Sequence, residues 1–333
     1  MTASDLNTWA TRAFVTFLIG AASPLISSGA WSQSSNYPSR PITVIVPFAA
    51  GGPADIYARV VSKGLQESLG VPVVVDNRGG ATGLIGSRFV KGAAPDGYTL
   101  LFTSNSAHIM APLLYKPAPF DPVADFTPIG IAVRYPMYLV TSPKLPAATF
   151  KEFIALARSQ PGKLNYASNG TGGGAHLGCE LMNIAAGVTA VHVPYKGVAP
   201  AQMSVITGET DYMCDSVGHS QPMVATKRLK GLALTGAARS GAVPEVPTMS
   251  EEGVNVQAYI WLGLLGPKGL PVGIRDKLST VTASVMNSAD MKRRMLNDGY
   301  EISAETPEQF ATAMNAEKKV WEKVIVEKEI KVE

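Results

Sequence analysis

The stretch from Ile42 to Asp55 reads ITVIVPFAAGGPAD and decides the fold. Its first five residues form a β-branched run bounded by prolines, which is typical of a buried parallel strand. A helical pattern follows, with apolar residues at positions 56, 60, 61, 65 and 69 and a stop signal at Gly70. A strand, a glycine turn and a helix in this order predict an α/β unit.

The same order recurs along the chain. The patterns predict strands over 73–75, 98–103, 164–167, 190–193 and 211–214, and helices over 81–91, 150–158, 175–186, 272–286 and 306–325. The chain also turns apolar over 261–267, before the helix at 272. Thr306 is expected to cap the last helix, with Gln309 closing a capping box. This alternation predicts an α/β fold, each domain a mostly parallel sheet flanked by helices.

We expect two domains, because the chain exceeds the usual size of a single core. One domain is predicted to combine residues 35–138 with 257–333, and the other to span 139–256. The chain would cross between them near 138–142 and 256–261.

The N-terminal residues 1–32 resemble a secretory signal peptide. Arg12 precedes an apolar run over 13–22, which is shorter than the roughly 20 residues that span a membrane. Ala30 and Ser32 supply small residues for cleavage, so the mature chain is expected to begin near Gln33. The pattern favours export to the periplasm over a buried N-terminal helix in a cytosolic protein.

The composition excludes several classes of protein. The net charge is +3 and no cluster of five to eight Lys or Arg residues occurs, which argues against nucleic-acid binding. No later segment has 18 consecutive apolar residues. Cys179 and Cys214 are the two cysteines, too few for a multi-cysteine zinc site. They permit one disulfide in an oxidising compartment, and a bridge and two free thiols fit the sequence equally well.

Two glycine loops are candidate anion sites, because ligands of open α/β sheets bind where such loops lead from strands into helices. The first covers 47–55, where glycines let the backbone approach a ligand and the helix offers unpaired N–H groups. The second, 168–174, reads SNGTGGG and adds the hydroxyls of Ser168 and Thr171. A tight turn without a ligand is the alternative for such a loop.

Motifs of enzymes are missing. The sequence has no Gly-x-Ser-x-Gly, no Gly-Lys-Ser/Thr and no His-Glu-x-x-His, and the second loop is no convincing dinucleotide fingerprint. We expect His176 to be a structural or ligand-facing hydrogen-bonding group rather than a general base. Asp215, at a strand end, could face the ligand or cap a turn. The chain is therefore predicted not to be an enzyme.

Many ordered motifs carry a family resemblance. They include YPxRPI at 37–42, VPF at 46–48, APDGYTL at 94–100, PGKLNYAS at 161–168, HVPYKG at 192–197 and VPT at 246–248. With these segments the chain resembles the Bug (TctC-type) extracytoplasmic solute receptors of tripartite tricarboxylate transporters, essentially end to end after the signal peptide. Gly173 departs from the Thr or Ser frequent in the family, and Cys179 and Cys214 are also unusual there.

The resemblance implies a two-domain type II periplasmic-binding-protein (Venus flytrap) fold and no cofactor or metal. It further implies a receptor that holds a small organic carboxylate through backbone amides and waters, and hands it to the transporter's membrane subunits. We expect this receptor to be a monomer. The alternative is a periplasmic sensor subunit that feeds a membrane signalling kinase. The residues expected to bind the ligand are Pro47, Phe48, Ala50, Gly51, Gly52, Ala54, Asp55, Ser104, Asn105, Ser168, Gly170, Thr171, Gly172, Gly173, His176, Tyr195 and Asp215.

Overall fold

The computed structural model describes residues 37–303, 305–327 and 330. The predicted signal peptide, residues 1–32, lies outside the described residues. Within the described ranges, no helix has both the length and the apolar character needed to cross a membrane.

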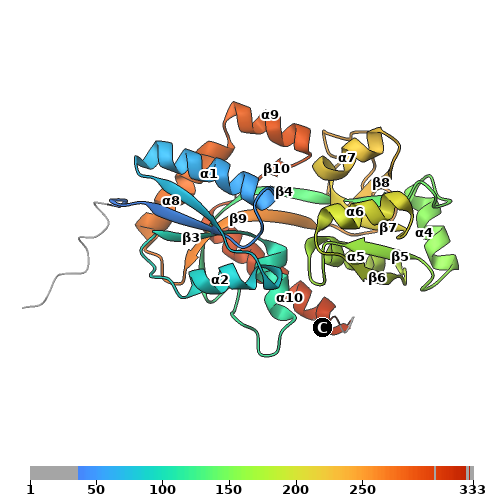
Figure 1. Cartoon of the computed structure of the whole chain (residues 1–333), viewed down its shortest axis with the longest axis horizontal. Coiled ribbons are helices and arrows are strands. Elements are labelled where there is room, and N and C mark those ends of the chain that lie inside the picture. The colour runs from blue at the N-terminus through green and yellow to red at the C-terminus, as the bar shows by residue number, and fades with distance from the viewer. Residues whose placement is uncertain (1–36, 304, 328–329, 331–333) are drawn as a thin grey trace, which may run out of the picture. The chain divides into compact units, whose positions relative to one another are not determined.

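The first half of the sheet contains the strand quoted above. β1 (Ile42–Val46) lies between β2 (Val73–Asn77) and β3 (Thr99–Ser104), and all three are parallel. β9 (Tyr259–Pro267) pairs antiparallel with β3, and β4 (Phe126–Thr141) pairs antiparallel with β9 and with the short β10 (Glu301–Ile302). Figure 1 shows the long strands β4 and β9 continuing from this half toward the other.

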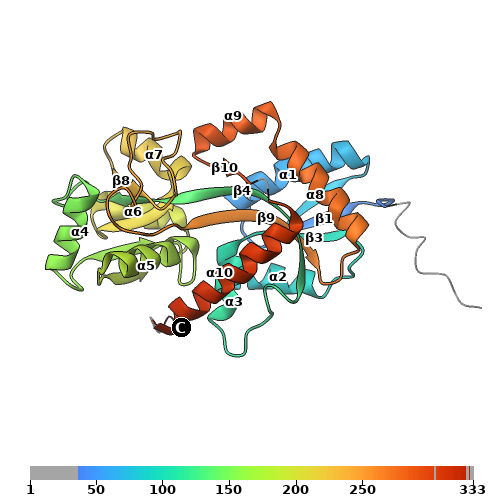
Figure 2. The ribbon, with the colours of Figure 1, turned by 180° about the vertical axis from the view of Figure 1, so that it is seen from behind.

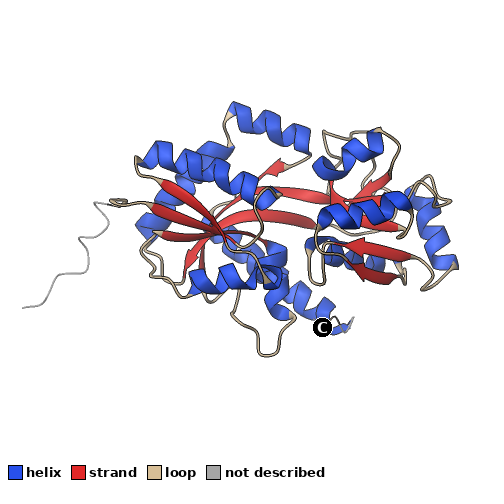
Figure 3. Ribbon diagram, viewed as in Figure 1, coloured by secondary structure: helices blue, strands red, loops and turns tan. Residues whose placement is uncertain are grey.

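Helices flank this half of the sheet on both faces (Figure 3). They are α1 (Pro53–Leu69), η1 (Ala81–Gly83), α2 (Leu84–Lys91), η2 (Ser106–Met110), α3 (Ala111–Leu113), α8 (Val272–Met286), α9 (Ala289–Asp298) and α10 (Pro307–Glu327). α10 packs on β4 and η2, on the side seen in Figure 2. Gly70 ends α1 in the left-handed conformation at φ 71°, which a glycine adopts without steric cost.

The second half of the sheet extends from the far end of β4. There β4 pairs antiparallel with β7 (Tyr212–Ser216) and β8 (Lys230–Leu234), while β5 (Asn165–Ser168) runs parallel to β7 and to β6 (Val191–Pro194). Its helices are α4 (Phe150–Ser159), α5 (Gly174–Ala186), α6 (Val198–Thr207) and α7 (Val217–Ala225).

β4 changes its partner strand between Pro136, which pairs with Tyr259 of β9, and Met137, which pairs with Ser216 of β7. Apolar side chains before this point, such as Val133, pack with α1 and α8, whereas those beyond it, such as Leu139, pack with α4 and α5. Each half thus has a core of its own, and a further cluster joins Leu177 of α5 to Trp261 and Phe310 of the first half. The change lies one or two residues before the crossing expected at 138–142.

The predicted helices and strands match the structure closely. α8 has the predicted bounds, and the capping box of α10 forms: the Thr306 N–H donates to Gln309 Oε1 (2.9 Å) and the Gln309 N–H to Thr306 Oγ1 (3.3 Å). The patterns did not identify the helices α6, α7 and α9 or the strands β8, β9, β10 and the 16-residue β4. β4 and β9 also make the sheet more antiparallel than the strand–helix alternation suggested.

Candidate functional site

The first loop, at the carboxyl end of β1, is held by a buried carboxylate. Asp55 Oδ2 accepts a hydrogen bond from the Gly51 N–H (2.9 Å), and Asp55 Oδ1 forms an ion pair with Arg59 at 2.9 Å. Burial alone would raise the pKa of Asp55, but hydrogen bonds from Arg59 and Gly51 outweigh it and lower the pKa below its usual value. Gly51 has φ 88°, which favours glycine. Asp55 therefore supports the loop from within.

Several N–H groups of this loop are free to bind a ligand. Those of Ala49, Ala50 and Gly52 donate to no group among the described residues. They precede the N-terminus of α1, a 17-residue helix with Gly52 as its N-cap. Unpaired N–H groups and the positive end of a helix dipole favour an anion here.

The second loop, after β5, is held by two histidines. Ser168 Oγ lies 2.6 Å from His192 Nε2, and the Gly172 N–H donates to His176 Nδ1 at 3.0 Å. Within the loop, the Gly170 N–H donates to Ser168 Oγ and the Gly173 N–H to the Gly170 carbonyl. Three of the loop's N–H groups are thus already used, and a ligand would have to use others.

The two imidazoles form part of an aromatic stack. The His176 and His192 rings are 3.8 Å apart, and the Tyr166 ring stacks on His192 at 5.0 Å. Burial lowers the pKa of His192 to about 4, and burial with the neighbouring His192 lowers that of His176 to about 3. Both are therefore neutral at pH 7, and His176 accepts at Nδ1. No local sequence pattern indicated the support from His192, although the HVPYKG motif contains this residue.

Both loops lie beside the segment that follows β3. A Cβ atom placed on Gly83, which packs on Pro47, would be 2.7 Å from the Cβ of Ala107 in η2. One placed on Gly174 would be 3.9 Å from the Cβ of Ser106. The hydroxyls of Ser104 and Ser106 are 2.8 Å apart. Pro47 of the first loop and Ser104 at the end of β3 therefore both lie near η2. Gly174, at the end of the second loop, also approaches η2.

Three other predicted residues have polar groups that bind the protein itself. Asn105 Nδ2 donates to the Tyr259 carbonyl (2.9 Å) and to Glu317 Oε1 (2.6 Å). The Tyr195 N–H donates to the Ser168 carbonyl and so ties β6 to the second loop. Asp215 accepts from Ser220 Oγ (2.7 Å) and from the Ser216 N–H (2.8 Å), and its Oδ2 lies 2.6 Å from His219 Nδ1. The Asp215 carboxylate is thus held by groups at the start of α7.

The remaining predicted residues differ in exposure. Ala50 and Gly51 are exposed, and Phe48, Gly52, Gly170 and Thr171 are partly exposed, while Pro47, Ala54, Ser104, Ser168, Gly172 and Gly173 are buried. Among the described residues, no three His, Cys, Asp or Glu side chains are grouped so as to hold a metal ion.

Cys179 of α5 and Cys214 of β7 are both fully buried. Their Cα atoms are 5.4 Å apart, and their sulfurs are paired as a disulfide. This separation lies within the usual range for a bridge. Between the two readings that the sequence left open, the structure has the bridge.

Comparisons with known proteins agree with this fold. Residues 57–330 match the family model TctC, described as tripartite tricarboxylate transporter family receptor. The chain is 34% identical to the protein BugT of Bordetella pertussis over 89% of this chain and 91% of BugT.

Two solved structures contain carboxylates. One is an R. palustris protein with adipate, 32% identical, with a TM-score of 0.78 over 87% of this chain and 97% of that chain. The other is MatC from Rhodopseudomonas palustris with bound malate, 31% identical, with a TM-score of 0.77 over 87% and 100%.

Proposed function

Since the chain belongs to the TctC family of tripartite tricarboxylate transporter receptors, we propose that it captures a small organic carboxylate in the periplasm and delivers it to the membrane subunits of such a transporter. The ligand binds as a monomeric receptor closes its two domains, residues 35–138 with 257–333 and residues 139–256, around it. The carboxylates bound by the two R. palustris proteins support this ligand class.

The observation that carries the proposal is the set of N–H groups before α1 that have no acceptor within residues 37–303, 305–327 and 330. Ala49, Ala50 and Gly52 offer fixed backbone donors at the positive end of a helix dipole. A carboxylate held by such groups needs no facing arginine, and Arg59, the nearest one in sequence, is already paired with Asp55. Waters and the hydroxyl of Thr171 complete the ligand's hydrogen bonds.

A thermal-shift screen with mono-, di- and tricarboxylates and with nucleotides tests the ligand class. We expect at least one carboxylate to raise the melting temperature, because a ligand at 100 times its dissociation constant stabilises the folded state by about 2.7 kcal/mol. A shift with a nucleotide and with none of the carboxylates would refute the proposal.

Calorimetric titration of variants tests how the anion is held. Gly51→Val strains the loop and places a branched side chain beside the donors, so we expect affinity for the carboxylate found in the screen to fall at least about tenfold. Gly162→Val is the matched control, because Gly162 also has a positive φ (71°) and open space around it but lies outside both loops. If Lys196→Ala abolishes binding while Gly51→Val binds normally, capture by the backbone is wrong.

A further inference from the structure

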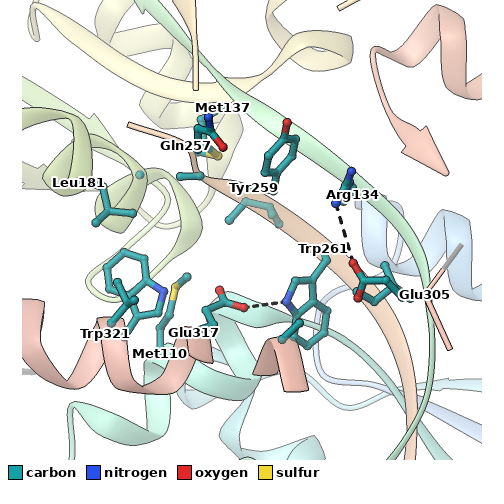
Figure 4. Close-up of a pocket in the computed structure, with 16 residues that line it drawn as sticks. Met110, Arg134, Met137, Leu181, Gln257, Tyr259, Trp261, Glu305, Glu317 and Trp321 are labelled. Atoms are coloured by element: carbon teal, nitrogen blue, oxygen red, sulfur yellow. Dashed lines mark hydrogen bonds and ion pairs between the residues drawn. The ribbon is translucent and has the colours of Figure 1, made fainter. Parts of the chain in front are cut away.

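A cavity of about 270 Å³ lies where β4 and β9 pass between the two halves of the sheet. Side chains from β4, β9, α5, α10 and η2 line it (Figure 4). None of the residues predicted to bind the carboxylate is among them. The cavity is therefore separate from the two glycine loops.

Aromatic and aliphatic side chains form most of its walls. Trp261 of β9 and Trp321 of α10 lie on either side of Glu317 in Figure 4, with Tyr259 and Leu181 above them. Trp261 is 6% exposed and Trp321 is 3% exposed, so the remaining exposed surface of each ring is small. Such walls suit an apolar body, and the faces of the indole rings attract a cation.

The polar groups in the cavity are mainly acceptors. The carboxylate of Glu317 accepts from Trp261 Nε1 (2.9 Å) and Asn105 Nδ2 (2.6 Å), which leaves lone pairs on both oxygens. Glu305 Oε2 is buried and has no hydrogen-bond partner within the described part of the chain. Both acids line the cavity and leave acceptor positions open beside the donors of Arg134 and Gln257.

The positive charge on the wall is already balanced. Arg134 is the only lysine or arginine among the described lining residues. It pairs with Glu301 at 3.1 Å and with Glu305 at 3.8 Å, and its guanidinium lies 4.9 Å from the centroid of the Tyr259 ring. No cation of the described chain pairs with Glu317, and its burial raises the pKa of the carboxyl to about 7 against the lowering effect of its hydrogen bonds. An incoming cation would supply the missing charge.

We propose that this cavity is a second binding site, which takes a small organic cation: a protonated primary amine on an apolar body. The ammonium group donates to Glu317 and to the unpartnered Glu305 Oε2, and the apolar body lies between the indole rings and Leu181. A carboxylate is repelled by the two acids. The residues that line the cavity are distinct from those proposed to bind the carboxylate, and Asn105 of that set contacts the site only through its hydrogen bond to Glu317.

Phenethylamine and its uncharged analogue 2-phenylethanol are the probes. Titration of each into the full mature protein, followed by calorimetry and tryptophan fluorescence, compares the same apolar body with and without the charge. We expect the amine to bind and to change the fluorescence, and the alcohol to bind at least about tenfold more weakly. Equal binding of both probes, or no binding of the amine at millimolar concentration, overturns the proposal.

Variants locate the amine. Glu317→Gln keeps acceptor and shape but removes the charge, so we expect affinity for phenethylamine to fall about tenfold. Glu322→Gln, on the same helix with its side chain 50% exposed, is the matched control and should bind normally. Ala313→Phe fills the cavity from an exposed position of α10 and should also weaken binding. Unchanged affinity in both Glu317→Gln and Ala313→Phe shows that the amine binds elsewhere and refutes the site.

Discussion

Reduction of the disulfide between Cys179 and Cys214 should destabilise the fold by a calculable amount. The bridge joins residues 35 positions apart. In the chain-entropy model, closing a loop of this length lowers the entropy of the unfolded chain by about 13 cal/mol/K, which stabilises the folded state by about 4 kcal/mol at 25 °C. With an unfolding entropy of roughly 2.1 cal/mol/K per residue over about 300 residues, the melting temperature should fall by roughly 6 °C on reduction.

Calorimetric melts with and without a phosphine reductant measure this difference, and mass spectrometry after alkylation confirms the redox state. Cys214→Ala is the control, because its melting temperature should not respond to the reductant. An unchanged melting temperature in protein that is shown to be fully reduced would refute stabilisation by the bridge. Alkylation of both cysteines in unreduced, unfolded protein would show that the bridge does not form.

Three further predictions concern stability and are checked by urea unfolding. His176 binds a proton less readily in the folded chain, where its pKa is about 3, than in the unfolded chain, where it is 6.5. The contribution of His176 to the free energy of unfolding therefore falls as the pH drops below 6.5, by about 2 kcal/mol at pH 5. His176→Phe should remove this pH-dependent loss. Thr306→Ala should lower the free energy of unfolding by about 1 kcal/mol, and Thr306→Ser should retain most of it, because the cap accepts from the Gln309 N–H. Gly273→Ala, in the first turn of α8 with open space around it, should raise that free energy by roughly 0.5 kcal/mol, and a decrease would contradict this.

The sequence predicted the elements whose signals are local. The run from Ile42 to Val46, the stop at Gly70 and the capping box at Thr306 each lie within a few residues, and each is present in the structure. β4 was not predicted as a strand, because it combines residues that pack in two different cores. Its partners, β9 and β7, come from distant parts of the chain.

In the candidate site, too, features with local sequence signals could be predicted and contacts between distant residues could not. The glycine loops and helix starts could be located from composition, but the internal hydrogen bonds that use their N–H groups could not. His192 lies 24 residues after Ser168 and approaches it because β6 pairs with β5. Asn105 contacts Glu317 across 212 residues of sequence. Contacts of this kind depend on which strands are neighbours in the sheet, and local residue patterns do not reveal that order.

The route of the chain through the sheet has a consequence for synthesis on the ribosome. β3 pairs with β9, for example Leu101 with Leu265, so the first half lacks an inner strand until about four fifths of the chain has been made. β5, β6, β7 and β8 all lie between residues 165 and 234 and need only β4, which precedes them. The segment in the middle of the gene can therefore complete its sheet before the segment that precedes it. The nascent chain carries β1, β2 and β3 with an open edge until β9 is synthesised.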